Sequence, residues 1–143
     1  MNTRRGVTII ELLVVICIFL AMVLVLTPFV KMAKVRARRI NCANNLRQIS
    51  LGLHGYAAEH NDMLPAQLND LYPNYINNDK AFDCPASRTI GTKERPDYKY
   101  KAGLAEASGP KEIVAEDLDG NHGKAGKNML RLNGAIEWNG NKF

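Results

Sequence analysis

The sequence predicts an α+β protein in which one long N-terminal helix packs on a small antiparallel sheet. Three observations support this prediction. An almost wholly apolar run covers residues 7–30, and a stripe of apolar residues at helical spacing continues beyond it. Near the C-terminus, Asn133-Gly134 separates two short strand-like segments, and this dipeptide is typical of two-residue hairpin turns. The helix should therefore have a transmembrane half followed by an amphipathic half.

Residues 7–30 are predicted to form the transmembrane half of the helix. At a rise of about 1.5 Å per residue the run would be about 36 Å long, which exceeds a hydrocarbon core of about 30 Å. The apolar core of a cleaved secretory signal has only about 7 to 15 residues. We therefore expect this run to stay in the mature protein.

Basic residues flank the apolar run on both sides. Arg4 and Arg5 precede it, and a larger basic group follows it, made of Lys31, Lys34, Arg36, Arg38 and Arg39. In a chain of net charge +5, this placement indicates lipid headgroups and solvated helix faces rather than nucleic acid. The excess of cations after the run, taken alone, would place residues 31–143 in the cytoplasm.

Glu11 is the one carboxylate in the apolar run. Insertion of an acidic residue costs about 2.5 to 3.5 kcal/mol at the middle of a membrane, and less near its surface. If the chain were cut between Gly6 and Val7, the new α-amino group of Val7 could pair with the Glu11 of a neighbouring chain. Such a pair would fix the axial register of packed helices. The alternative is a plain single-pass anchor in which Glu11 is incidental.

The segment from Arg4 to Ile16, RRGVTIIELLVVI, resembles the prepilin processing motif of type IV pilins and type II secretion pseudopilins. That motif has a short basic leader, a glycine, a cleaved bond, an apolar first residue and a glutamate at the fifth mature position. Glu11 takes the place of that glutamate, and Val7 replaces the usual phenylalanine. Pro28 falls where many major subunits carry a proline.

The resemblance implies how the chain is processed and organised. Residues 1–6 would be a cleaved leader, and prepilin peptidase would cut between Gly6 and Val7 and N-methylate Val7. Glu11 and Pro28 would then serve filament assembly. The mature chain would comprise a transmembrane helix over residues 7–30, its amphipathic continuation over 31–60 and a globular head over 61–143.

The resemblance also implies a structural subunit, not an enzyme, of a type II secretion pseudopilus. The alternative is a type IV pilin of a surface pilus for adhesion, motility or DNA uptake. The expected partners are copies of the chain itself, prepilin peptidase and the inner-membrane assembly platform, and nucleic acid is not expected. The chain would cross the bacterial inner membrane once, with its head in the periplasm. This orientation is the reverse of the one that counting cations favours.

The amphipathic half of the helix is predicted from a stripe of apolar residues. They are Val35, Cys42, Leu46, Ile49, Leu53 and Tyr56. Pro28 could end the first helix or kink one long helix, and the unbroken stripe beyond it favours the kink. The helix should end near His60-Asn61, ahead of Pro65.

The head should contain a helical turn over residues 66–72 and a loop over 73–96, followed by short strands. The strands are expected at residues 98–103, 113–116, 128–132 and 135–138. The sheet should be antiparallel and lie against the apolar stripe of the helix.

The three cysteines have different expected roles. Cys17 lies in the apolar run, where a thiol acts as a small hydrophobe. Cys42 and Cys84 lie in the domain that the resemblance places outside the cytoplasm, where a disulfide is favoured. A Cys42–Cys84 bond would pin the long loop to the helix, and the alternative is two free thiols.

The sequence suggests one cofactor, calcium, and otherwise none. Asp117, Asp119 and Asn121 place oxygen side chains at alternate positions, and some secretion pseudopilins use calcium in such loops. The alternative is a solvated turn, because the segment lacks the glutamate that completes an EF-hand. His122 and Asn133-Gly134 partly match a C-terminal pattern of pilin-like proteins.

No catalytic set and no zinc-ligand spacing emerges from the sequence. The three histidines are expected on the surface, as His54, His60 and His122.

Overall fold

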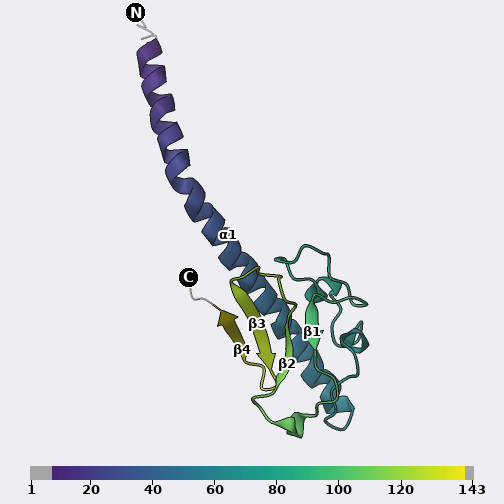
Figure 1. Ribbon diagram of the computed structural model, residues 1–143. Coiled ribbons are helices and arrows are strands. Elements are labelled where there is room, and N and C mark those ends of the chain that lie inside the picture. Colours follow the sequence, from purple (N-terminus) through teal and green to yellow (C-terminus); the bar gives the residue numbers. More distant parts are fainter. Residues whose placement is uncertain (1–7, 141–143) are drawn as a thin grey trace, which may run out of the picture. The chain divides into compact units, whose positions relative to one another are not determined.

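Figure 1 shows the computed structural model of the chain, which describes residues 8–140. The chain divides into two compact units, residues 1–36 and 37–143, and each is described by itself. Helix α1, Ile9–Glu59, begins in the first unit and ends in the second.

In unit 1, helix α1 is continuous through Pro28. Proline has no backbone N–H, so the carbonyl one turn earlier loses its usual helical donor. Immediately before Pro28, the Thr27 hydroxyl donates a hydrogen bond to the carbonyl of Val23 at 2.7 Å. The helix nevertheless continues to Glu59 and does not stop at Pro28, as one of the two predicted alternatives required.

Helix α1 ends at Glu59, one residue before the predicted end. The two residues that follow His60 have left-handed backbone conformations, with φ of 53° at Asn61 and 62° at Asp62. The Asp62 N–H donates to the carbonyl of Ala57 at 2.9 Å, which satisfies one of the last helical acceptors.

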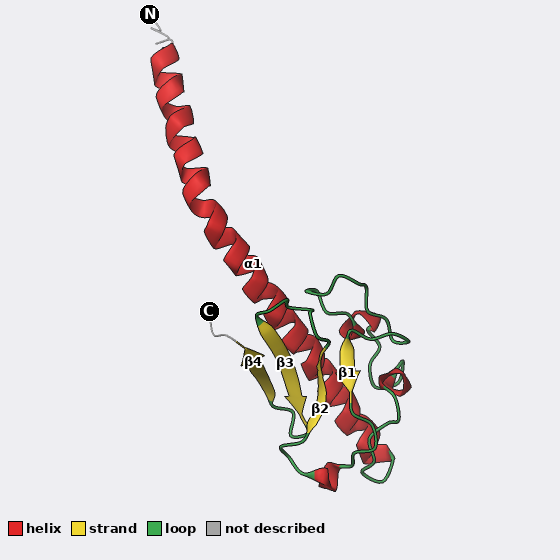
Figure 2. Ribbon diagram, in the orientation of Figure 1, coloured by secondary structure: helices red, strands yellow, loops and turns green. Residues whose placement is uncertain are grey.

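Unit 2 is an α+β arrangement, as predicted. Its four-stranded antiparallel sheet has the order β1-β2-β3-β4 and lies against the second half of α1 (Figure 2). The strands are β1 Tyr98–Tyr100, β2 Ile113–Asp117, β3 Gly126–Arg131 and β4 Ile136–Gly140. Short 3-10 turns lie at Leu68–Leu71, Asp79–Phe82 and Glu106–Ser108. The apolar stripe enters the core from Cys42 onward, where Leu46 and Ile49 are buried with Leu130 of the sheet. Val35, the first residue of the predicted stripe, is exposed.

The β3–β4 connection is longer than the two-residue turn that the sequence predicts. The Arg131 N–H donates to the carbonyl of Ala135, which leaves three residues in the loop. Leu132 is buried, and its N–H donates to the carbonyl of Glu112 at 2.8 Å. Leu132 therefore belongs to the core, and the turn is made by Asn133 and Gly134, with Gly134 at a φ of 79°.

The loop around Cys84 depends on a glycine at position 91. A Cβ at Gly91 would lie 2.3 Å from the carbonyl oxygen of Phe82 and 2.8 Å from the Cα of Asp83. Both contacts are with backbone atoms, which cannot rotate away. The close approach lets the Gly91 N–H donate to the Asp83 carboxylate at 2.9 Å.

We expect Gly91→Ala to lower the free energy of unfolding of unit 2 by about 1 to 3 kcal/mol, the usual cost of forced overpacking. Urea unfolding followed by the fluorescence of Trp138 would measure it. Gly55→Ala is the matched control, because its Cβ would meet only the Tyr75 side chain, at 3.3 Å. That variant should gain up to about 1 kcal/mol of helix propensity. Equal stability of Gly91→Ala and the natural chain would show that the loop can shift at no cost.

Candidate functional site

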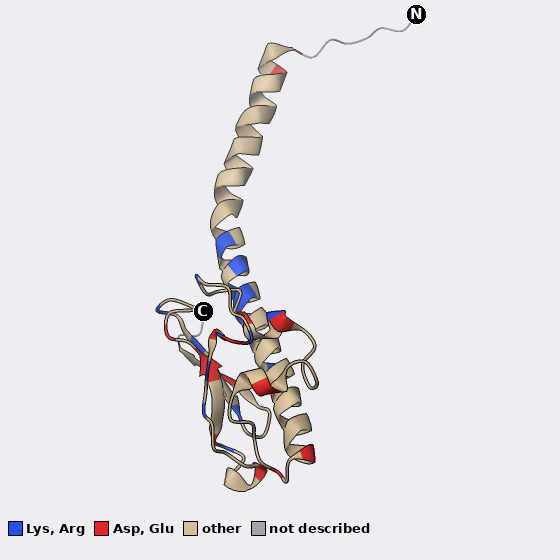
Figure 3. Ribbon diagram, turned by 90° about the vertical axis from the view of Figure 1, so that its right-hand side faces the viewer, with Lys and Arg blue, Asp and Glu red and all other residues tan. Residues whose placement is uncertain are grey.

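In unit 1, helix α1 carries apolar side chains on every side. Over its most apolar 18 residues, none of these side chains is buried within the chain. Among residues 8–140, α1 is the one helix long and apolar enough to cross a membrane. The basic residues of α1 follow this apolar stretch (Figure 3). A helix that is apolar all round is compatible with a membrane anchor, because only lipid or other apolar helices can cover it.

Glu11 lies in the first turn of α1 and forms a reciprocal pair with Thr8. The Glu11 N–H donates to the Thr8 hydroxyl at 3.3 Å, and the Thr8 N–H donates to a Glu11 carboxylate oxygen at 3.5 Å. This arrangement is a capping box, in which a threonine and a glutamate three residues later satisfy two free N–H groups. Sequence reasoning missed it, although the Thr-x-x-Glu spacing was a sufficient signal. The predicted cleavage residues, Gly6 and Val7, lie outside the described residues.

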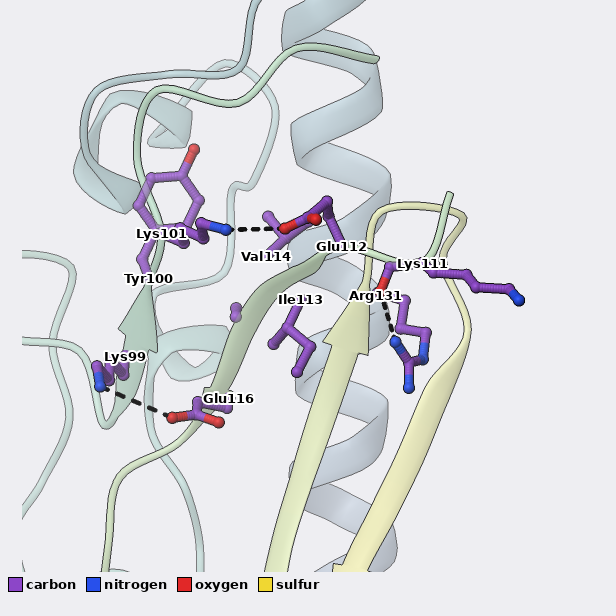
Figure 4. A pocket seen from close by; sticks show the side chains of 10 residues that line it. Lys99, Tyr100, Lys101, Lys111, Glu112, Ile113, Val114, Glu116 and Arg131 are labelled. Carbon is purple, nitrogen blue, oxygen red and sulfur yellow. Dashed lines mark hydrogen bonds and ion pairs between the residues drawn. The ribbon is translucent and has the colours of Figure 1, made fainter. Parts of the chain in front are cut away.

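The exposed face of the sheet has a shallow groove lined by β1, β2 and Arg131 (Figure 4). Several of its charged groups form ion pairs with carboxylates of the sheet. The Lys101 ammonium lies 2.8 Å from the Glu112 carboxylate, and Lys99 and Lys127 both lie within 4 Å of Glu116. The hydrogen bond from Lys101 lowers the pKa of Glu112, and the bond to Glu116 raises the pKa of Lys127. These lysines are therefore matched by carboxylates and do not form an uncompensated cationic stripe.

The three residues predicted to bind calcium are not brought together. Asp117, at the end of β2, is buried, and one of its carboxylate oxygens accepts from the Asn128 N–H at 2.7 Å. The Asp119 side chain is 94% exposed and lies 3.3 Å from the Lys127 ammonium. The Asn121 amide donates to the carbonyl of Asp97 at 2.9 Å. Strand β2 ends at Asp117, and the chain turns directly after it, which leaves the Asp119 side chain in solvent instead of beside Asp117.

The structure joins Cys42 and Cys84 in a disulfide, the pairing that the sequence suggested. Cys42 comes from α1, and Cys84 comes from the loop that follows the 3-10 turn Asp79–Phe82. Both are buried. Asp97 supports the loop, because its carboxylate accepts from the Cys84 N–H at 3.2 Å and from the Thr89 hydroxyl at 2.9 Å.

His122 is not a surface histidine, in contrast to the prediction. Its side chain is only 2% exposed, and its Nε2 lies 3.1 Å from a carboxylate oxygen of Asp117. The same nitrogen lies 3.7 Å from the sulfur of Cys84. The ring meets Trp138 edge-on, with centroids 5.5 Å apart. The β2–β3 connection, residues 118–125, makes successive turns that bring His122 back over the end of β2, which no local pattern shows.

Four side chains thus meet at one buried place: Cys42, Cys84, Asp117 and His122, here called the buried cluster. Each offers one possible ligand atom, and these atoms all lie within 4.8 Å of one another. Sequence reasoning missed the cluster because its members come from four separate segments. The signals were the cysteine pair and the pilin-like pattern that begins at His122.

Residues 32–72 match a family model described as a protein of unknown function (DUF1559). This is a family of bacterial pilin-like or pseudopilin-type proteins. Over this segment the chain is similar to that family. No curated protein and no solved structure matches the chain.

The matched segment covers the second half of α1 and the turn Leu68–Leu71, less than a third of the chain. It includes Cys42 but not Cys84, Asp117 or His122. The comparisons therefore bear on the helix and assign no role to the buried cluster.

Proposed function

We propose that the chain is a structural subunit of a membrane-anchored, pilus-like filament, the pseudopilus of a type II secretion system. The observation that carries this proposal is the first half of α1, which is apolar on all sides and has one carboxylate in its first turn. So large an apolar surface needs a cover, because exposed apolar patches of this extent mark membrane or protein contacts. Lipid would supply the cover before assembly, and helices of neighbouring copies would supply it afterwards.

Glu11 gives this assembly a defined register. Once the chain is cut after Gly6, the α-amino group of Val7 on one subunit pairs with the Glu11 carboxylate of the next. N-methylation by prepilin peptidase leaves that amine basic, so the pairing survives. The pair selects one axial offset between helices, even if it adds little net stability.

The disulfide supports a location of unit 2 outside the cytoplasm. Disulfides persist in oxidising compartments such as the bacterial periplasm and are rare in the cytosol. We therefore place the head on the periplasmic side of the inner membrane and the assembly platform as its membrane partner. The paired charges on the sheet favour a structural role over nucleic-acid binding, because duplex binding needs uncompensated lysines and arginines.

The small head favours a secretion pseudopilin over a surface pilin. Electron microscopy of the host with and without the gene separates the two. Long surface pili that vanish on deletion would assign the chain to a surface pilus, whereas loss of an exported protein without loss of surface pili would support the secretion role.

The intact mass of the chain recovered from host membranes tests the processing step. We expect a chain that begins at Val7 and carries one extra methyl group, and an uncut chain in a host that lacks prepilin peptidase. A chain that begins at Met1 in both hosts would mean that the motif is not processed. The filament proposal would then fail, and a plain membrane anchor would remain.

A further inference from the structure

The buried cluster has the donors of a transition-metal site. It offers two sulfurs, one imidazole nitrogen and one carboxylate oxygen, all within 4.8 Å of one another. Zn²⁺ takes four such ligands in a tetrahedron, with bonds of about 2.0 to 2.3 Å, which puts the ligand atoms about 3.3 to 3.8 Å apart. The Nε2 of His122 already lies 3.7 Å from the Cys84 sulfur and 3.1 Å from an Asp117 oxygen. Small side-chain rotations would complete the set once the two sulfurs are no longer bonded to each other.

An independent feature of Asp117 points to a cation. Its side chain is fully buried, and one carboxylate oxygen, Oδ1, has no hydrogen-bond partner among the described residues. Buried carboxylate oxygens are almost always paired, because each unpaired one has given up its water. A disulfide carries no charge and donates no hydrogen bond, so it gives no reason for an acid beside it. A divalent metal bound to the two sulfurs would explain the acid, because the carboxylate would be a negatively charged ligand of the cation.

The surroundings hold the ligands in place, as they do in established metal centres. The backbone and side-chain amides of Asn128 both donate to Oδ2 of Asp117, at 2.7 and 2.9 Å. The Asn128 side chain also reaches the carbonyl of Arg39 on α1, at 3.4 Å. Trp138 packs edge-on against the His122 ring. Second-shell hydrogen bonds of this kind fix ligand orientation and tune metal affinity.

We propose that the reduced chain binds Zn²⁺ through Cys42, Cys84, Asp117 and His122, so that the metal and the disulfide are alternative states of one site. On binding, the two cysteine thiols lose their protons and become thiolate ligands. When the disulfide forms, the two thiolates pass two electrons to a disulfide oxidant by thiol–disulfide exchange. The oxidant takes two protons from solvent and leaves as a dithiol, and Zn²⁺, which changes no oxidation state, is released. In either state Cys42 of α1 is tied to Cys84 of the loop.

This site is independent of the filament role, because its four residues lie in unit 2 and need neither processing nor assembly. It also differs from the predicted calcium site in ligand type. Sulfur and imidazole select zinc-like metals, whereas calcium requires six to eight oxygens.

The test is a metal titration of the full chain in detergent micelles. The protein is reduced with a phosphine, which takes up one oxygen from water as the disulfide becomes two thiols, and is then stripped with EDTA and desalted without oxygen. Co²⁺ serves as the coloured probe, and Zn²⁺ is added to displace it. We expect one Co²⁺ per reduced chain, with thiolate charge-transfer absorption and the intense visible bands of tetrahedral Co²⁺. The oxidised natural chain should bind none, and it tests the site without any mutation.

Variants then assign the ligands. His122→Ala and Asp117→Asn should each weaken Zn²⁺ binding by about tenfold or more, and Cys84→Ser should remove the charge-transfer band. Cys17→Ser and His60→Ala are matched controls outside the buried cluster and should bind as the natural chain does. Near-ultraviolet circular dichroism of Trp138 shows whether each variant is folded.

Three results would overturn the proposal. They are a reduced natural chain that binds no Co²⁺, an oxidised chain that binds it equally well, or folded His122 and Asp117 variants with unchanged affinity.

Discussion

Glu11→Gln should leave the chain in the membrane but remove it from filaments. We expect the amount of the variant in the filament fraction to fall by more than about tenfold, since losing one partner of a buried charge pair costs well over the 1.4 kcal/mol that a factor of ten represents. The reason is that the glutamine has no charge to pair with the α-amino group of the next subunit's Val7. That amine would then enter the apolar bundle unpaired.

The capping box makes this experiment discriminating. Glutamine can replace glutamate in a capping box, so Glu11→Gln keeps the cap with Thr8 and removes only the charge. Thr8→Ala does the reverse, because it removes the capping hydroxyl and leaves the carboxylate. We expect Thr8→Ala to cost the helix start about 1 kcal/mol and to assemble normally.

The amount of each variant would be measured in filaments sheared from the cells and in alkali-washed membranes. The first gives the assembled fraction, and the second gives the fraction that remains in the membrane. If Thr8→Ala failed to assemble and Glu11→Gln assembled normally, Glu11 would act only as a cap. The proposal that Glu11 sets the axial register between subunits would then be wrong.

Much of the fold could be predicted because it rests on local patterns. The first half of helix α1 follows from the length of the apolar run, and the second half, which ends at Glu59, follows from hydrophobic periodicity. The strands were also placed near their observed positions, although β1 ends at Tyr100, earlier than expected. The β3–β4 turn differed because Leu132 is drawn into the core, a tertiary effect that overrides the Asn-Gly preference.

The site was predicted only in part, and the reason is again physical. The cysteine pair could be proposed because only two cysteines lie outside the apolar run. Asp117 was noticed for its spacing to Asp119, but its true neighbours are His122 and Asn128, which reach it through the β2–β3 turn. Whether a polar side chain faces the core or the solvent depends on the strand register, and the alternation in this region does not reveal it.

Loss of the Cys42–Cys84 disulfide should lower the free energy of unfolding of unit 2 by about 4 kcal/mol. The bond spans a sequence separation of 42, and closing a loop of this size restricts the unfolded chain by about that amount in the chain-entropy description. Domains are typically stable by about 5 to 15 kcal/mol, so a large share of the total depends on this bond. Urea unfolding of the full chain in micelles, followed by Trp138 fluorescence with EDTA present, would compare the oxidised and reduced forms of one sequence.

Two variants make the comparison sharper. Cys17→Ala removes the free cysteine of the apolar helix and should leave the stability of unit 2 unchanged. The double variant Cys42→Ala with Cys84→Ala should lose at least as much as reduction does, because it also removes two buried sulfurs. A reduced protein within about 1 kcal/mol of the oxidised one would mean that the head holds the loop by packing alone.

Replacing EDTA with Zn²⁺ connects this measurement to the buried cluster. A ligand that binds only the folded state adds stability in proportion to the logarithm of its concentration, about 2.7 kcal/mol at a hundred times its dissociation constant. Zn²⁺ should therefore restore much of what reduction removes, and it should do nothing for the oxidised chain. Because the metal acts through His122 and Asp117 as well as the sulfurs, the restoration should fall in His122→Ala by about 1.4 kcal/mol for each tenfold loss of Zn²⁺ affinity, even though both thiols remain. A disulfide that served only as a staple would show no such dependence on His122.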